Sequence, residues 1–155
     1  MISIWTLTKL NNAVIWLNNL RFRSQYGQMK QIKTNNYMRI ILSTDNSLTA
    51  MRLRDLIIKS VKGEIEGLSI ETWSYTRSRN NFDILYHDLE QYTQDPAKNV
   101  LFKMEIDGSN VLLSSAWWKN NPEPLYEIVC LHTGRLTEML LRYFRGKYIK
   151  FSVVE

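Results

Sequence analysis

Cysteine and histidine are scarce in this sequence: its 155 residues include one cysteine, Cys130, and two histidines, His87 and His132. A single thiol excludes an internal disulfide framework. It fits a reducing compartment, and we expect the protein to be cytoplasmic. One cysteine and two histidines also fall short of the four ligands that a structural zinc site usually has, so we expect no metal.

Glycine is also sparse, and the six glycines form none of the loops that bind nucleotide phosphates. The sequence has no Gly-x-x-x-x-Gly-Lys loop and no Gly-x-Gly-x-x-Gly loop. The Gly-x-Ser-x-Gly turn that presents a catalytic serine is absent as well. On a helix, Cys130 and His132 would point about 200° apart, so they would not pair as nucleophile and base, and we expect Cys130 in the core. We therefore predict no catalytic residue and no cofactor.

Long apolar runs are missing. No stretch approaches the roughly 20 apolar residues that a membrane-spanning helix needs. Hydrophobic residues nevertheless make up 45% of the chain and charged residues 23%, which is typical of a globular protein. A length of 155 residues is enough for one domain with a substantial core.

Acidic residues are absent from the first 37 positions, which contain five basic residues: Lys9, Arg21, Arg23, Lys30 and Lys33. The chain has 20 basic and 15 acidic side chains, so the other residues carry fifteen of each and the whole excess of +5 belongs to this segment. Residues 6–22 have the apolar periodicity of an amphipathic helix. We interpret residues 1–37 as a basic N-terminal helix and linker, and residues 38–155 as a single α+β domain. Three roles for the helix stay open: packing on the domain, binding a surface or targeting, or preceding a natural start at Met38.

One long helix is predicted over residues 121–146. Asn121 suits the capping position, Pro122 the first helical position, and Gly146 the left-handed residue that ends a helix. Apolar side chains recur there at steps of three and four residues: Leu125, Val129, His132, Leu136, Met139, Leu140 and Tyr143. The alternative is a break at Gly134, because glycine disfavours a helix interior, with residues 127–132 as a strand.

The remaining elements follow from apolar periodicity and turn residues. A helix is expected over residues 48–62, capped by Asp45, Asn46 or Ser47. Strands are expected over residues 38–44, 68–77, 82–87, 100–106, 111–117 and 147–154. Asp107-Gly108 between two alternating runs indicates a hairpin. These elements predict an α+β fold: a mainly antiparallel sheet of about five to six strands with two helices packed on one face, an elaborated ferredoxin-like arrangement, preceded by the N-terminal amphipathic helix.

Aromatic and basic residues form two groups that suit protein recognition. The first is Trp117, Trp118 and Lys119. Neighbouring residues of a strand point to opposite faces, so we expect only one of these tryptophans in the core and the other at an edge, under a loop or partly exposed. The second group runs from a strand into a turn and contains Trp73, Tyr75, Arg77 and Arg79. We interpret both groups as candidate partner-binding residues.

Three functions are compatible with these patterns. The first hypothesis is a non-catalytic protein-binding protein, most simply an inhibitor or immunity-type protein that neutralises a toxin or enzyme in a stoichiometric complex. The alternative is an RNA- or single-stranded-DNA-binding module that uses the five basic residues of the N-terminal arm and the aromatic strand. A second alternative is a small metal-dependent nuclease whose candidate residues are Asp45, His87, Glu105 and Asp107.

Overall fold

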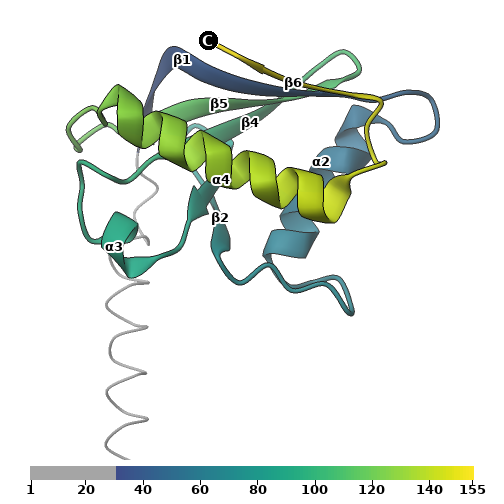
Figure 1. Cartoon of the computed structure of the whole chain (residues 1–155), viewed down its shortest axis with the longest axis horizontal. Coiled ribbons are helices and arrows are strands. Elements are labelled where there is room, and N and C mark those ends of the chain that lie inside the picture. The colour runs from purple at the N-terminus through teal and green to yellow at the C-terminus, as the bar shows by residue number, and fades with distance from the viewer. Residues whose placement is uncertain (1–30) are drawn as a thin grey trace, which may run out of the picture. The chain divides into compact units, whose positions relative to one another are not determined.

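Six strands form one antiparallel sheet in the order β2-β3-β4-β5-β1-β6 (Figure 1). The structure is a computed structural model and describes residues 31–155, so the predicted helix over residues 6–22 and the basic residues up to Lys30 lie outside the described residues. The strands are β1 (Ile32–Ser43), β2 (Trp73–Arg77), β3 (Asp83–His87), β4 (Leu101–Asp107), β5 (Asn110–Trp118) and β6 (Lys150–Val154). The helices of the described part are α2 (Ala50–Val61), α3 (Glu90–Thr93) and α4 (Tyr126–Phe144). This confirms a mixed fold of helices and a mainly antiparallel sheet.

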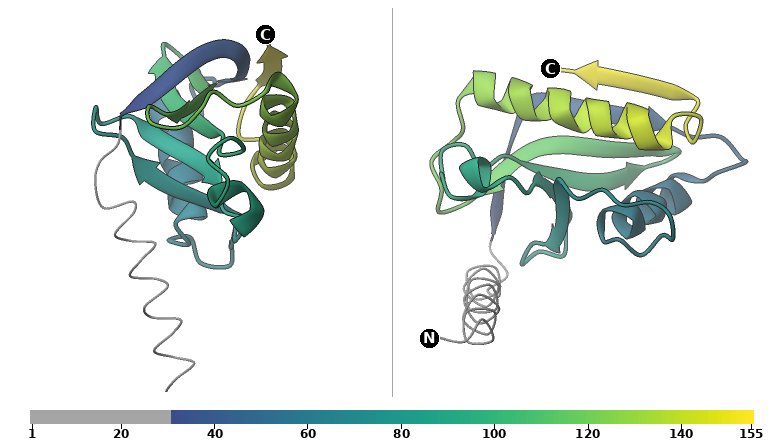
Figure 2. Two further views of the ribbon diagram at one scale, coloured as in Figure 1. Left: turned by 90° about the vertical axis from the view of Figure 1, so that its left-hand side faces the viewer. Right: turned by 60° about the horizontal axis from the view of Figure 1, so that its bottom comes forward.

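One face of the sheet forms the hydrophobic core with α2 and α4. Cross-strand partners supply its centre: Ile40 lies opposite Leu113, and Leu113 lies opposite Met104 on its other side. These side chains are buried in a single cluster with the apolar faces of both helices. Because alternate residues of a strand share a face, the two helices pack against the same side of the sheet. The end-on view shows α4 as a layer beside the strands (Figure 2, left). None of the helices within residues 31–155 is long and apolar enough to cross a membrane.

Helix α4 begins later than predicted and continues without a break. Its first residue is Tyr126 rather than Pro122, and Leu125 is 70% exposed instead of belonging to the buried face. Pro124 explains the difference, because a residue that precedes proline is disfavoured in the helical conformation and the chain stays extended up to this point. The helix passes through Gly134, so the continuous helix is confirmed and a strand over residues 127–132 is wrong. Gly146 has a φ of 85°, as expected for the residue that ends the helix.

Helix α2 is capped by a residue that the sequence pattern did not identify. The Thr49 hydroxyl accepts a hydrogen bond from the Arg52 backbone N–H at 3.3 Å, so the predicted caps at residues 45–47 are wrong. Asp45 instead accepts a hydrogen bond from the Ser47 backbone N–H at 2.8 Å and stabilises the turn before the helix. Aspartate often bonds the backbone two residues on in this way, and this local turn competes with capping.

The β4–β5 hairpin has the predicted turn, while other strand limits differ. Asp107 pairs with Asn110 across the turn, and Gly108 has a φ of 56°. Strand β1 begins at Ile32, before the predicted start at Met38, and its register against β5 shifts between Thr34 and Arg39. Residues 68–72, predicted as strand, precede β2 without joining the sheet. Strand β2 is shorter than predicted because it pairs only with β3, and β3 has five residues with which it can pair.

Replacing Gly134 with alanine is expected to stabilise the protein by about 1 kcal/mol, because alanine has the higher helix propensity. Gly134 is exposed within α4, and an added Cβ would meet no atom within 4 Å. Thermal or urea denaturation measures the change. Gly146→Ala is the matched control: its φ of 85° disfavours a side chain, so this variant should lose stability. A Gly134→Ala variant no more stable than the parent would contradict the expectation.

Candidate protein-binding site

The tryptophans predicted as binding residues lie in the interior. Trp73, Trp117 and Trp118 are 3%, 6% and 4% exposed. The expectation that one of the two neighbouring tryptophans would be partly exposed or at an edge is therefore wrong. Strand β5 lies between β4 and β1, and every residue from Leu113 to its end is buried, so both faces of the strand are covered there. These indole rings contribute to packing in this structure and present no open surface.

Lys119, which follows the two tryptophans, is exposed. Its ammonium group donates a hydrogen bond to Oε1 of Gln31 at 3.0 Å, and its backbone N–H donates to the Gln31 carbonyl at 2.8 Å. These bonds join the end of β5 to the residue before β1. Lys119 therefore has a structural role in the described part of the chain. Strands β3 and β4 lie between β5, which Lys119 follows, and β2, which carries the second predicted group.

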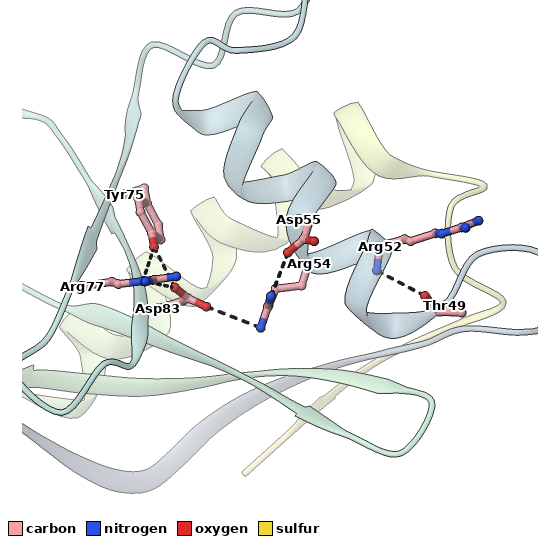
Figure 3. Close-up of polar contacts among 7 residues, drawn as sticks. All are labelled: Thr49, Arg52, Arg54, Asp55, Tyr75, Arg77 and Asp83. Carbon is pink, nitrogen blue, oxygen red and sulfur yellow. Dashed lines mark hydrogen bonds and ion pairs between the residues drawn. The ribbon is translucent and has the colours of Figure 1, made fainter.

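Tyr75 and Arg77 of the second group converge on a carboxylate that the sequence patterns did not single out (Figure 3). The Tyr75 hydroxyl donates a hydrogen bond to Oδ1 of Asp83 at 2.7 Å. Nε of Arg77 lies 3.1 Å from the same oxygen and 2.9 Å from the Tyr75 oxygen, and donates to both. Pairing of β2 with β3 places these groups together, because Arg77 lies directly opposite Asp83.

Helix α2 contributes a further arginine to this cluster. Nη1 of Arg54 lies 3.7 Å from Oδ2 of Asp83, while Nη2 is 2.9 Å from Asp55 on the same helix. Figure 3 shows Arg54 between the two carboxylates. The side chain of Asp83 is only 9% exposed, so its charge depends on these partners rather than on water. We call Tyr75, Arg77, Asp83 and Arg54 the Asp83 cluster.

Electrostatics in the Asp83 cluster keep Arg77 charged and Tyr75 neutral. Burial and the hydrogen bond to Asp83 raise the pKa of the Tyr75 hydroxyl. The same carboxylate raises the pKa of the Arg77 guanidinium through its hydrogen bond. Within residues 31–155, Arg77 makes its internal contacts through Nε, and its side chain is 59% exposed. The cluster therefore holds one end of a cationic side chain and leaves the rest accessible to a partner.

Arg79 lies in the turn that joins β2 to β3 and is exposed. Ser78 organises this turn: its backbone N–H donates to the Phe82 carbonyl at 3.0 Å, and its hydroxyl accepts from the Phe82 N–H at 3.1 Å. Asn81 has a φ of 60° there, a conformation that asparagine tolerates better than most residues. Arg79 is therefore carried on an ordered turn at the end of the strand that holds Arg77.

The residues of the nuclease hypothesis do not form a metal site. Glu105 is paired with Lys103 at 2.7 Å, and Asp45 holds the turn described above. His87 is buried beside Trp73, and Asp107 is exposed at the end of β4. Among residues 31–155, no three histidine, cysteine, aspartate or glutamate side chains are grouped so as to hold a metal ion. Of the basic residues proposed to contact nucleic acid, Lys33 alone is described, and it is exposed on β1.

The fold and the Asp83 cluster define this protein as a helix-covered, mainly antiparallel α/β protein with a buried carboxylate that positions an exposed arginine. No family model, curated protein or solved structure matches the chain.

Proposed function

We propose that this protein is a non-catalytic binding protein, an inhibitor or immunity-type protein that neutralises a toxin or enzyme by forming a stoichiometric complex. The observation that supports the proposal is the geometry of Arg77. Its guanidinium is held by Asp83 and by the Tyr75 hydroxyl, yet its side chain is 59% exposed. Arginine is enriched among the residues that dominate binding energy at protein interfaces. Holding it in place before binding reduces the entropy lost on association.

The surroundings of Arg77 indicate the chemistry of the partner. Arg79 is exposed in the adjoining turn. Nζ of Lys62, the residue after α2, lies 6.0 Å from the centre of the Tyr75 ring and is paired with Glu64. The carboxylate of Asp83 is buried, and the nearby carboxylates of Asp55 and Glu64 are paired with Arg54 and Lys62. Arg77 and Arg79 are therefore the exposed cations that we propose to contact a partner at this end of β2. We therefore propose a partner with surface carboxylates, since a guanidinium binds a carboxylate through two parallel hydrogen bonds.

Replacing Arg77 with alanine is expected to weaken the complex about 30-fold, which corresponds to about 2 kcal/mol at a binding hot spot. The partner is first isolated from a native lysate on the immobilised full chain, and its stoichiometry and affinity are then measured by calorimetry. Arg135→Ala is the matched control, because Arg135 is a 54% exposed arginine on α4, outside the Asp83 cluster. It should bind as the parent does.

Two results would count against the proposed function. One is the absence of any stoichiometric protein partner. The other is retention of single-stranded RNA or DNA in about 50 mM salt with affinity that falls steeply as salt is added, which is the behaviour of a nucleic-acid-binding protein. If the Arg77→Ala variant and the parent bind an isolated partner with equal affinity, the protein is still a binding protein, but its interface lies outside the Asp83 cluster.

For the architecture, we propose an elaborated ferredoxin-like arrangement. Four strands run in the order β6-β1-β5-β4, and the helices α2 and α4 follow the first strand and precede the last. The β2–β3 hairpin extends the sheet beyond β4. In this arrangement the hairpin that carries Tyr75, Arg77 and Asp83 is an addition to the four-stranded core, so the proposed binding residues lie on an elaboration rather than on the core strands.

A further inference from the structure

The only two histidines of the chain come together around one tyrosine. His87 at the end of β3 and His132 of α4 have ring centres 6.1 Å apart, with the rings nearly perpendicular. The ring of Tyr92, in the short helix α3, lies 4.5 Å from His132 and 5.4 Å from His87, measured between ring centres. The ring centre of Trp73 lies 5.1 Å from that of His87. We call His87, His132 and Tyr92 the histidine clamp.

Both imidazoles are buried without full hydrogen bonding. His87 is 6% exposed and His132 is 1% exposed. Among residues 31–155, Nδ1 of His87 and both ring nitrogens of His132 lack a hydrogen-bond partner of normal geometry. An imidazolium ion placed there would have to lose its water without gaining an acceptor for each of its N–H groups, which is costly. The clamp is therefore built for neutral imidazoles.

The segment that the clamp holds has few other attachments. Residues 88–98 contain no buried residue, and α3 itself buries none of its four residues. Tyr92 is half-buried and is the aromatic side chain of this segment that packs on the imidazoles. Asp88 at one end donates its backbone N–H to the Thr72 carbonyl at 2.9 Å, and Asn99 at the other end is buried. A segment with so few buried contacts opens at low free-energy cost once its anchor is disturbed.

We propose that the histidine clamp is an acid-sensitive device: with neutral imidazoles it fastens residues 88–98 to α4 and β3, and protonation of His87 and His132 releases this segment while the sheet stays folded. The released segment would expose Tyr92 and the two imidazoles to water. This conformational change is independent of the proposed binding function, since the Asp83 cluster lies at the opposite end of β3 from His87.

The charged groups around the histidine clamp provide little stabilisation for protonated imidazoles in the closed form. On α4, Arg135 faces His87 and opposes its protonation, while the neighbouring Asp88 favours it. Asp88 is exposed and its carboxylate accepts a hydrogen bond from the Ser74 hydroxyl at 2.6 Å. Because water and Ser74 also interact with this carboxylate, its attraction for a protonated His87 is weakened. His132 faces His87, and the Lys98 carbonyl is the group that favours its protonated form. Glu90 of α3 is exposed and bonded to Gln94, and Glu138 pairs with Arg135.

The pH range follows from these environments. Burial is the main cause that lowers the pKa of His87, and burial together with His87 lowers the pKa of His132 to about 4. Once residues 88–98 are released, the imidazoles of His87 on β3 and His132 on α4 would be in contact with water, and their pKa would have the ordinary value of about 6.5. The open form then binds more protons than the closed form as the pH falls from about 6.5 towards 4, so the closed form loses stability in this window and keeps it above.

The test combines imidazole NMR with amide hydrogen exchange on the full chain at pH 7 and pH 4.5. Two histidine signals are expected, both titrating below the ordinary value. After correction for intrinsic exchange rates, the Tyr92, Thr93 and Gln94 amides, which donate to Leu89 and Glu90, should lose at least tenfold protection at pH 4.5. Amides in the middle of α4 should keep theirs. Segment protection that is unchanged at pH 4.5, or lost only together with α4, overturns the proposal.

Variants of the two histidines distinguish release caused by histidine protonation from other effects of low pH on the protein. His132→Phe keeps an aromatic ring against Tyr92 and removes the proton site, so the segment should retain its protection at pH 4.5. His87→Phe serves the same purpose at the other ring if the first variant does not fold. Glu90→Gln is the matched control, because Glu90 is an exposed titratable residue of the same segment and should leave the acid response unchanged. Acid release in a folded His132→Phe or His87→Phe variant equal to that of the parent overturns the proposal.

Discussion

Replacing Phe102 with alanine is expected to lower the free energy of unfolding by about 3 to 5 kcal/mol. Phe102 is 0% exposed and lies in the middle of the sheet, opposite Leu85 on β3 and Ser115 on β5. Its ring centre is 6.1 Å from that of Trp73, and it belongs to the core that both helices cover. Removal of the ring would leave a cavity that the surrounding strands and helices have no freedom to fill.

Leu125→Ala is the matched control for Phe102→Ala. Leu125 is 70% exposed before α4, so its truncation should change stability by less than about 0.5 kcal/mol. Urea denaturation followed by tryptophan fluorescence measures both variants at pH 7. A Phe102→Ala variant within about 1 kcal/mol of the parent would show that this part of the core is less tightly packed than the structure has it.

Replacing Asp83 with alanine is expected to cost about 2 to 3 kcal/mol, because removal of one partner from a buried charge network leaves the others unpaired. The Tyr75 hydroxyl, Nε of Arg77 and Nη1 of Arg54 would all lose their contact with this carboxylate. This expected loss of stability is smaller than that for breaking a fully buried ion pair, because Arg77 is 59% exposed and its guanidinium can be hydrated instead. Urea denaturation at pH 7 gives the loss.

Asp55 provides the comparison for Asp83. Its side chain is 49% exposed and pairs with Arg54 at 2.9 Å, so Asp55→Ala should cost well under about 1 kcal/mol. Under conditions in which Asp83→Ala is still folded, that variant should also bind the partner more weakly, because Arg77 is no longer held. Equal stability losses for the two variants would mean that burial of Asp83 does not set the strength of the network.

The sheet and the two long helices were predictable because their signals are local. Apolar periodicity located α2 and α4, and Asp107-Gly108 located the β4–β5 hairpin, since each depends on residues close together in the chain. The start of α4 was missed for a local reason as well, because the effect of Pro124 on the residue before it outweighs capping by Asn121.

The burial of Trp117 and Trp118 was not predictable from β5 alone. Alternation within a strand indicates which residues share a face, but it does not show whether the second face is also covered. That depends on which other parts of the chain pack over the face, and the alternation of one strand carries no information about it. A partly exposed tryptophan was expected for a sheet with one covered face, whereas every residue of β5 from Leu113 to Trp118 is buried.

The candidate site was partly visible in the sequence. Tyr75 and Arg77 were identified from their residue types, whereas Asp83 was not, although an aspartate on the same face as Leu85 would need a partner if that face were buried. Arg54 could not be assigned to Asp83, because only the packing of α2 on the sheet brings these two side chains close. The two histidines could not be assigned to one another either, because only the packing of α4 brings their rings together.

The position of β1 between β5 and β6 has a consequence for how the chain folds. This first described strand pairs with β5 and β6, so Leu42 finds its partners Val111 and Phe151 only after most of the sequence has been formed. Contacts between such distant residues require closure of long loops and slow the formation of the native state. The β4–β5 hairpin closes through a short turn and can form first. Until β6 docks, β1 has an unpaired edge, and an unpaired strand edge favours pairing with another chain and aggregation.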